Sequence, residues 1–218
     1  MKMFRHRFQA LLTPGVQWLL CLLAGMYVAA VIGKWLQAFD LYGWLTLSGS
    51  QFWSGQIWRL VTYALLPAGV LDFSMNSAAL VMLGAMLERH WSRGELWLYC
   101  VVAAAGAGLA KVILQFSGSL PLVGAAPMMF GLLIAWGVLC GREVISVVLF
   151  GEMTVWKLVL GAGAVGFLIL FLTAGLFAAI IMAGGGMTGF LYLWVKHRWL
   201  MSRAGSVVHS ERISRLEL

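Results

Sequence analysis

The sequence predicts an all-α protein that crosses a membrane several times, and three observations support this fold class. Of the 218 residues, 62% are hydrophobic and 11% are charged, and the mean hydropathy is +0.92. Soluble domains carry roughly 25% charged residues, so a water-soluble fold of this length could not bury so much apolar surface. The apolar residues also form long continuous runs, which favours transmembrane helices over an alternating β-barrel pattern.

Apolar runs along the chain predict a single bundle of about six transmembrane helices. The fourth and sixth runs are shorter than the roughly 20 residues of a full crossing, so we expect a water-accessible hollow above them. Residues 1–15 and 201–218 are expected to form cytosolic ends, the latter solvated or frayed, around a transmembrane domain at 16–200. The short run 144–150 is expected to extend the cytosolic end of a span. The six runs cover about residues 16–33, 70–87, 96–114, 125–140, 156–173 and 182–195.

The positive charges predict the orientation of these spans. The net charge of +7 comes from basic residues that flank the apolar runs, so it indicates topology and not a nucleic-acid surface. With a cytosolic N-terminus, all fifteen Lys and Arg residues lie on the cytosolic side except Lys34, Arg59 and Lys111. Both termini are therefore predicted to be cytosolic. The absence of a recognisable cleavable signal or transit peptide favours a bacterial inner membrane.

The long connection 34–69 is rich in aromatic residues and is interrupted by glycine and serine. Because amphipathic aromatic side chains prefer the headgroup region, we expect this segment to lie in the outer interface, anchored there by Trp58 and Arg59. Its aromatic residues are Trp35, Trp44, Phe52, Trp53, Trp58 and Tyr63.

The cysteines give no sign of a metal centre or a disulfide framework. Cys21, Cys100 and Cys140 each lie within an apolar run, and the sequence holds no Cys-x-x-Cys motif or local Cys/His cluster. We interpret them as small buried hydrophobic residues, and we expect neither a metal nor another cofactor.

Four stretches of the chain occur in the order and spacing of a known family. They are "GQIWRLVTYALLPAG", "DFSMNSAALVMLGAMLERHWSRGELWL", "GAAPMMFGLLIAW" and "GGGMTGFLY". Together they resemble the rhomboid intramembrane serine proteases over nearly the whole chain. The resemblance implies six helices around a hollow that opens to the outer side. It also implies a serine on the fourth span that attacks a peptide bond in a substrate's transmembrane segment. A histidine on the sixth span serves as base, and an asparagine and a histidine of the second span hold the oxyanion.

The chain departs from that pattern at the two central positions. The nucleophile position holds Ala126 and the base position holds Gly186, while Asn76 keeps the family's identity. Without a hydroxyl oxygen no acyl-enzyme can form, and without an imidazole no hydroxyl is activated.

Three further departures surround these positions. The residue after the nucleophile position is Pro127, which has no backbone N–H for an oxyanion hole, and two histidine positions hold Pro67 and Asp72. These changes together favour natural loss over a single laboratory substitution of the nucleophile. The four histidines are all expected in cytosolic flanks, away from the hollow: His6, His90, His197 and His209.

The sequence therefore predicts a rhomboid-like pseudoprotease that binds transmembrane segments of other membrane proteins in the bilayer without cleaving them. The alternative is an intramembrane serine endopeptidase with an unconventional dyad. Asp72 is a candidate binding group or, alternatively, a cap of the second span, and Lys111 either snorkels outward or replaces the base. The residues expected to contact a bound segment are Trp58, Arg59, Asp72, Asn76, Gly124, Phe130 and Gly189.

Overall fold

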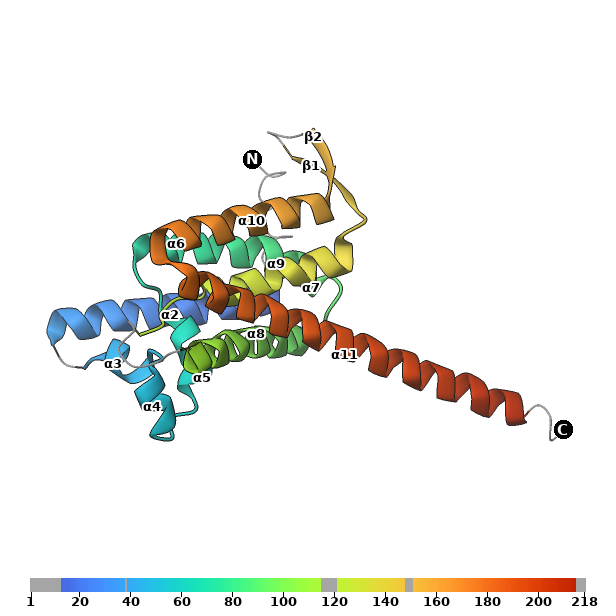
Figure 1. The fold of residues 1–218 in the computed structure, drawn as a ribbon, viewed down its shortest axis with the longest axis horizontal. Coiled ribbons are helices and arrows are strands. Elements are labelled where there is room, and N and C mark those ends of the chain that lie inside the picture. The colour runs from blue at the N-terminus through green and yellow to red at the C-terminus, as the bar shows by residue number, and fades with distance from the viewer. Residues whose placement is uncertain (1–12, 38, 115–120, 148–150, 215–218) are drawn as a thin grey trace.

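The chain folds into a bundle of long helices, seen in the computed structural model in Figure 1. The structure describes residues 13–214 except 38, 115–120 and 148–150. Within this part of the chain, five helical segments are long and apolar enough to cross a membrane, and α9 is a shorter apolar helix. This confirms the all-α polytopic fold. The long elements are α2 (Pro14–Leu36), α6 to α7 (Val70–Glu88, with a π-helical turn η2 at Leu80–Gly84), α8 (Arg93–Leu114), α9 (Ala126–Cys140), α10 (Val155–Ala174) and α11 (Leu176–Ser214).

Short elements connect the long helices. The aromatic connection after α2 forms a series of small helices, and its tryptophans Trp44, Trp53 and Trp58 are exposed, as is Trp35 in the last turn of α2. An antiparallel hairpin lies between α9 and α10. The short elements are α3 (Leu41–Leu45), α4 (Gly49–Trp53), α5 (Arg59–Thr62), the 3-10 turn η1 (Tyr63–Leu65), β1 (Val144–Val147) and β2 (Gly151–Thr154).

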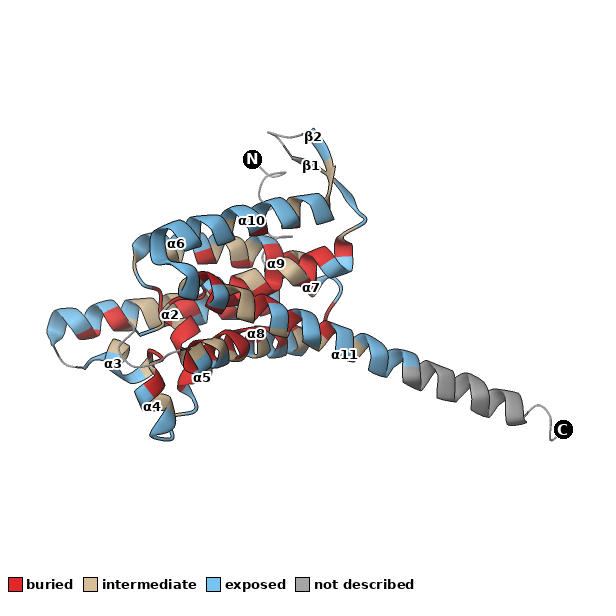
Figure 2. Cartoon of the chain, viewed as in Figure 1, coloured by how far each residue is buried: buried red, intermediate tan, exposed pale blue. Residues whose placement is uncertain are grey.

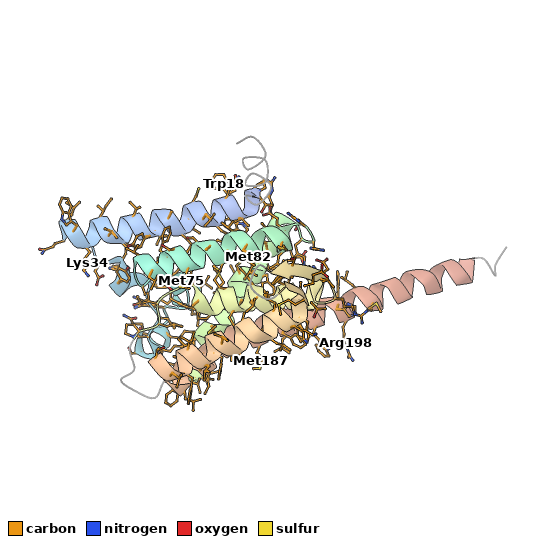
Figure 3. The ribbon with its side chains drawn as sticks, turned by 90° about the horizontal axis from the view of Figure 1, so that it is seen from above. Trp18, Lys34, Met75, Met82, Met187 and Arg198 are labelled. Atoms are coloured by element: carbon orange, nitrogen blue, oxygen red, sulfur yellow. The ribbon has the colours of Figure 1, made fainter. Side chains whose placement is uncertain are left out.

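The bundle has two ends, which we name after Gly124, just before α9, and Cys140, the last residue of α9. The Gly124 end holds the last turn of α2 and the first turns of α6 and α9, whereas the Cys140 end holds the first turn of α2, the end of α9 and the hairpin. Figure 3 places Lys34 and Met75 toward the first end and Trp18 and Arg198 toward the second.

The core lies between α8, α9 and α11, where buried residues concentrate in Figure 2. Of the most apolar 18-residue stretch of each helix, 56% of the residues are buried in α8 and 11% in the peripheral helix α10. Glycines allow the close approach of these helices: a Cβ on Gly106 would overlap the Thr188 hydroxyl, and one on Gly189 would overlap the Tyr99 hydroxyl.

The Glu88 carboxylate joins α7 to the beginning of α2. It accepts the backbone N–H of Gly15 at 2.8 Å and of Val16 at 3.2 Å, and it also accepts the Thr13 hydroxyl. An anion at a helix N-terminus satisfies unpaired N–H groups and interacts favourably with the helix dipole. Glu88 therefore fixes the Cys140 end of α2 against the second crossing.

The sixth helix differs from the prediction. It begins at Leu176 instead of 182, because Gly175 has a φ of +87° and reverses the chain in one residue after α10. Its membrane-spanning part, Leu176–Met201, has 26 residues, so the expected shortness of the sixth span is wrong, whereas that of α9, with 15 residues, is confirmed. The helix continues to Ser214 instead of fraying after residue 202.

Residues 144–147 do not extend a span, which corrects a second expectation. They form β1 of the hairpin, paired with β2 in the register Val144↔Thr154 to Val147↔Gly151, and residues 148–150 lie outside the described part. β-Branched residues favour extended pairing, and Gly151, the first residue of β2, has a φ of +70° that glycine adopts without strain.

Candidate functional site

The backbone conformation just before α9 requires a glycine at position 124. Gly124 has a φ of +103°, a conformation that is strained for other residues. Its N–H donates to the Tyr63 carbonyl at 3.2 Å, and a bridge between Leu47 and Leu122 pins the preceding segment to the aromatic connection. The sharp turn thus positions Ala126 as the first residue of α9, where it is exposed.

A polar pair lies on α6 beside this turn. Asp72 accepts the backbone N–H of Ala68 at 3.0 Å through Oδ2 and the side-chain amide of Asn76 at 2.8 Å through Oδ1. Asn76 is buried, and a Cβ on Gly124 would lie 3.1 Å from Oδ2 of Asp72. The structure therefore brings Asp72, Asn76 and Gly124 together, and the bond to Ala68 ties the first turn of α6 to the residue before its N-cap, Gly69.

Tyr42 of α3 joins this group, although no motif in the sequence selects it. Its hydroxyl donates to the carbonyl of Pro67, one of the two histidine positions of the family pattern, at 2.9 Å. Burial raises the pKa of Tyr42, and Tyr27 and the Asp72 carboxylate raise it further. A contact between residues 25 positions apart leaves no local spacing signal, so only the fold reveals it.

The nucleophile and base positions lie on facing helices. A Cβ on Gly185 would lie 2.5 Å from the carbonyl oxygen of Pro127, so α11 approaches the first turn of α9 closely. A Cβ on Gly186 would lie 2.5 Å from Cδ1 of Ile134 and 2.9 Å from Cδ1 of Phe130. The space that a side chain at position 186 would need is therefore occupied by these two residues.

The histidines with described side chains lie far from Ala126. A ring nitrogen of His90 lies within 4.8 Å of the sulfur of Cys140, which is 14 residues, or roughly 21 Å of helix, from Ala126. His197 follows Gly186 by 11 residues, or roughly 16 Å along α11. His6 and the side chain of His209 lie outside the described part, so only His90 and His197 are placed, both away from the Gly124 end.

Arg59 has a different environment from the one expected. It is buried, and its guanidinium Nη1 donates to the Thr46 carbonyl at 2.6 Å while Nε donates to the Gln56 side chain, so Arg59 links α5 to the connecting segment before it. Burial lowers its pKa. Trp58 is exposed and borders, with Arg59, a hollow of about 430 Å³ that Asp40, Gly43, Trp44 and Gln56 complete.

An apolar groove of about 510 Å³ opens between α9, α10 and α11 beside the base position. Phe130 and Gly186 form part of its wall, whereas Gly189 faces Tyr99 on the α8 side of the same helix. The groove is lined by Phe130, Leu133, Ile134, Trp156, Val159, Leu160, Gly163, Ala164, Phe167, Ala183, Gly186, Met187 and Phe190. The seven residues expected at the site are therefore divided among the polar pair, the hollow, the groove and the packed core.

Lys111, a second ionisable group of interest, lies within α8. Its residue is only 6% exposed, so the expectation that it snorkels outward is wrong. The residue belongs to the part of α8 that packs against α5 and α11 through small residues such as Gly108.

Comparison with known families agrees with this architecture. The family model of the Rhomboid domain matches residues 54–199, which includes α5 to α10 and most of the membrane-spanning part of α11. The match covers the polar pair, the beginning of α9 and the groove. No curated protein sequence matches the chain.

Proposed function

We propose, from the premise that the chain belongs to the rhomboid family, that it binds transmembrane segments of other membrane proteins without cleaving them. The observation that carries this proposal is the environment of the base position. Gly186 has no side chain, and Phe130 and Ile134 fill the space into which an imidazole would project. A serine protease needs a base within hydrogen-bond reach of its nucleophile.

The nucleophile position supports the same conclusion. Ala126 offers no oxygen, and Pro127 offers no N–H to an oxyanion. Ser77, which follows Asn76, has a buried hydroxyl without a hydrogen-bond partner among the described residues. It lies 11 residues, or roughly 16 Å of helix, before the end of α7, and His90 lies beyond that end. Peptidase activity would therefore need a base other than the histidines whose side chains are described.

The groove supports binding of an apolar helix. Its lining is nearly all apolar and includes small residues of α10 and α11, which permit close helix contacts within a bilayer. The first turns of α9 lie between the groove, at Phe130, and the Asp72–Asn76 pair, at Gly124. A client helix in the groove would thus have polar groups nearby for its own weakly bonded backbone.

The topology belongs to the same proposal. The charge distribution supports cytosolic termini, and with them an outward-facing Gly124 end, in a bacterial inner membrane. The clients would then be inner-membrane proteins whose transmembrane segments enter laterally from the lipid.

The test combines a reaction assay with a binding assay. The purified protein in detergent is incubated with a tagged transmembrane-segment substrate and labelled with a fluorophosphonate serine probe. We expect no labelling and no cleavage, with intact substrate recovered on the protein. Labelling together with cleavage would overturn the proposal and favour the endopeptidase.

Two matched variants locate the binding surface. Ala164→Trp places an indole in the groove, whereas Ala162→Trp places one on an exposed part of α10 that does not line it. We expect the first variant to reduce substrate recovery at least fivefold and the second to leave it unchanged. Equal recovery from both variants would contradict the groove as the binding surface.

A further inference from the structure

The Cys140 end holds a cluster of metal-ligating side chains that come from separate parts of the chain. Among the described residues, the ligand atoms of His90, Cys140 and Glu143 all lie within 4.8 Å of one another. His90 belongs to the turn after α7, Cys140 is the last residue of α9, and Glu143 directly precedes β1. Fifty residues separate the histidine from the cysteine, so a search for local Cys/His spacing does not find the cluster.

The hydrogen bond of the His90 ring leaves one ring nitrogen free to bind an ion. Nδ1 of His90 lies 3.2 Å from the carbonyl oxygen of Met86. A carbonyl can only accept a hydrogen bond, so the bond assigns the proton to Nδ1 and leaves the lone pair on Nε2. Metal-binding histidines commonly donate their second nitrogen to a backbone carbonyl in this way, which fixes both tautomer and ring orientation.

The backbone around the other two ligands is fixed by the hairpin. The N–H of Glu143 donates to the Cys140 carbonyl at 2.9 Å, and the Glu143 carbonyl accepts the N–H of Val155 at 3.0 Å. The N–H of Trp156 donates to Gly141 at 3.1 Å, which closes the turn between the two ligands. Cys140 and Glu143 are therefore held in place by secondary structure instead of by a mobile loop.

A cavity beside the cluster leaves room for a further ligand. It has a volume of about 750 Å³ and is lined by Cys140 and Glu143 together with Arg142, Thr154 and Trp156. His90 and Glu143 are exposed, so an ion can reach the cluster from water, while Cys140 supplies its sulfur from the buried side.

We propose that His90, Cys140 and Glu143 form a zinc-binding site. One thiolate, one imidazole and one carboxylate are the donor types that Zn²⁺ takes, and three protein ligands leave a fourth tetrahedral position for water. The soft thiolate disfavours Mg²⁺ and Ca²⁺. Binding releases the thiol proton to solvent, and the two ligand anions then balance the charge of the ion.

The experiment uses the full-length protein, purified in detergent without a polyhistidine tag, in a Cys21→Ala/Cys100→Ala background. Cys140 is then the sole thiol, because the chain has three cysteines. Co²⁺ is titrated as a spectroscopic probe and then displaced by Zn²⁺. We expect one Co²⁺ per chain, a thiolate-to-cobalt charge-transfer band, strong visible bands of a tetrahedral ion, and loss of these signals on addition of Zn²⁺.

Matched variants distinguish this site from adventitious binding. His90→Ala and Glu143→Gln alter exposed side chains, so they leave the core intact, and each is expected to weaken binding about 100-fold or more, since second-shell changes alone cost about 10–100-fold. His197→Ala and Glu152→Gln, exposed residues outside the cluster, are the controls and should bind as the parent does. Absence of the charge-transfer band, or equal affinities of cluster and control variants, would overturn the proposal.

Discussion

The polar and ionisable side chains at the two ends of the bundle differ in what they contact. At the Gly124 end, where the family resemblance places catalysis, Tyr42, Asp72 and Asn76 bond to one another or to the backbone. At the Cys140 end, His90, Cys140 and Glu143 come together at distances that suit a shared ion. The polar side chains at the end that resembles an active site are thus bonded within the fold, while the opposite end offers a set of ligands.

This contrast is possible because the core between the ends does not depend on either of them. Glycines of α8, α9 and α11 hold the three helices together, and the contacts between Gly131 and Ala103 and between Gly185 and Pro127 need no catalytic side chain. The packing of the bundle therefore requires neither a serine at the position of Ala126 nor a histidine at the position of Gly186.

Substitution in the shared core should have the largest effect and would disturb both ends together. A Cβ in Gly189→Ala overlaps the Tyr99 hydroxyl, which donates to the Gly131 carbonyl at 2.8 Å and links α8 to α9. We expect a loss of about 3 kcal/mol in the free energy of unfolding, measured by SDS-induced unfolding in mixed micelles.

The control for this change is Gly161→Ala on exposed α10, where an added Cβ meets nothing within 4 Å. Alanine is the better helix former, so we expect this variant to be neutral or up to about 1 kcal/mol more stable. Equal unfolding curves for the two variants would mean that the glycine contacts of α11 do not determine the core.

Zinc should stabilise the protein only through the Cys140 end, so its effect on unfolding distinguishes the two ends of the bundle. A ligand that binds the folded state stabilises it by about 2.7 kcal/mol at 100 times its dissociation constant. We expect Zn²⁺ to stabilise the parent protein by this amount, and we expect His90→Ala to abolish the increment. The Gly124-end variant Asp72→Asn should retain it. An increment that survives in His90→Ala would place the ion elsewhere.

The cap of α2 should produce the next largest effect. Glu88→Gln keeps the size of the side chain but removes the charge that accepts the N–H groups of Gly15 and Val16 at the helix N-terminus. We expect a loss of about 2 kcal/mol in unfolding free energy, because hydrogen bonds to charged groups contribute about 1.5–3 kcal/mol. Glu152→Gln on β2 is exposed and should change stability by less than about 0.5 kcal/mol. Similar losses in both would show that a general charge effect, and not the cap, is responsible.

The fold class was predictable because membrane-spanning helices leave long, continuous apolar runs. The first five runs correspond to α2, to the segment from α6 to α7, and to α8, α9 and α10. The predicted start of the sixth helix and the predicted extension of a span at 144–150 were wrong where local backbone conformation, and not hydrophobicity, determines the direction of the chain. Gly175 permits a reversal that starts α11 six residues early, and the pairing of Val144–Val147 with Gly151–Thr154 takes a run that is apolar enough to extend a helix into a sheet.

The candidate site was predictable only where short sequence motifs mark its residues. The motif positions locate Asn76, Ala126 and Gly186, and the structure brings their helices together. Contacts between distant segments leave no such pattern, so the roles of Tyr42 and Glu88 emerge only from the packed structure. Arg59 illustrates the reverse case: its position beside Trp58 predicts a headgroup contact, but in the fold its guanidinium is buried and donates to the Thr46 carbonyl and to the Gln56 side chain.

The smallest expected effect concerns Asp72, for which two roles remain in competition. Asp72→Asn removes one of two acceptors, so either the Ala68 N–H or the amide of buried Asn76 loses its partner, and we expect a loss of about 1 kcal/mol in unfolding free energy. If the pair also meets the polar groups of a client helix, recovery of the substrate should fall about fivefold, the equivalent of about 1 kcal/mol. Asp40→Asn, an exposed residue whose side chain makes no cap bond to α3, serves as the control and should change neither quantity. A loss of stability with unchanged recovery would make Asp72 a helix cap alone, and the apolar groove would then be the sole binding surface at the Gly124 end.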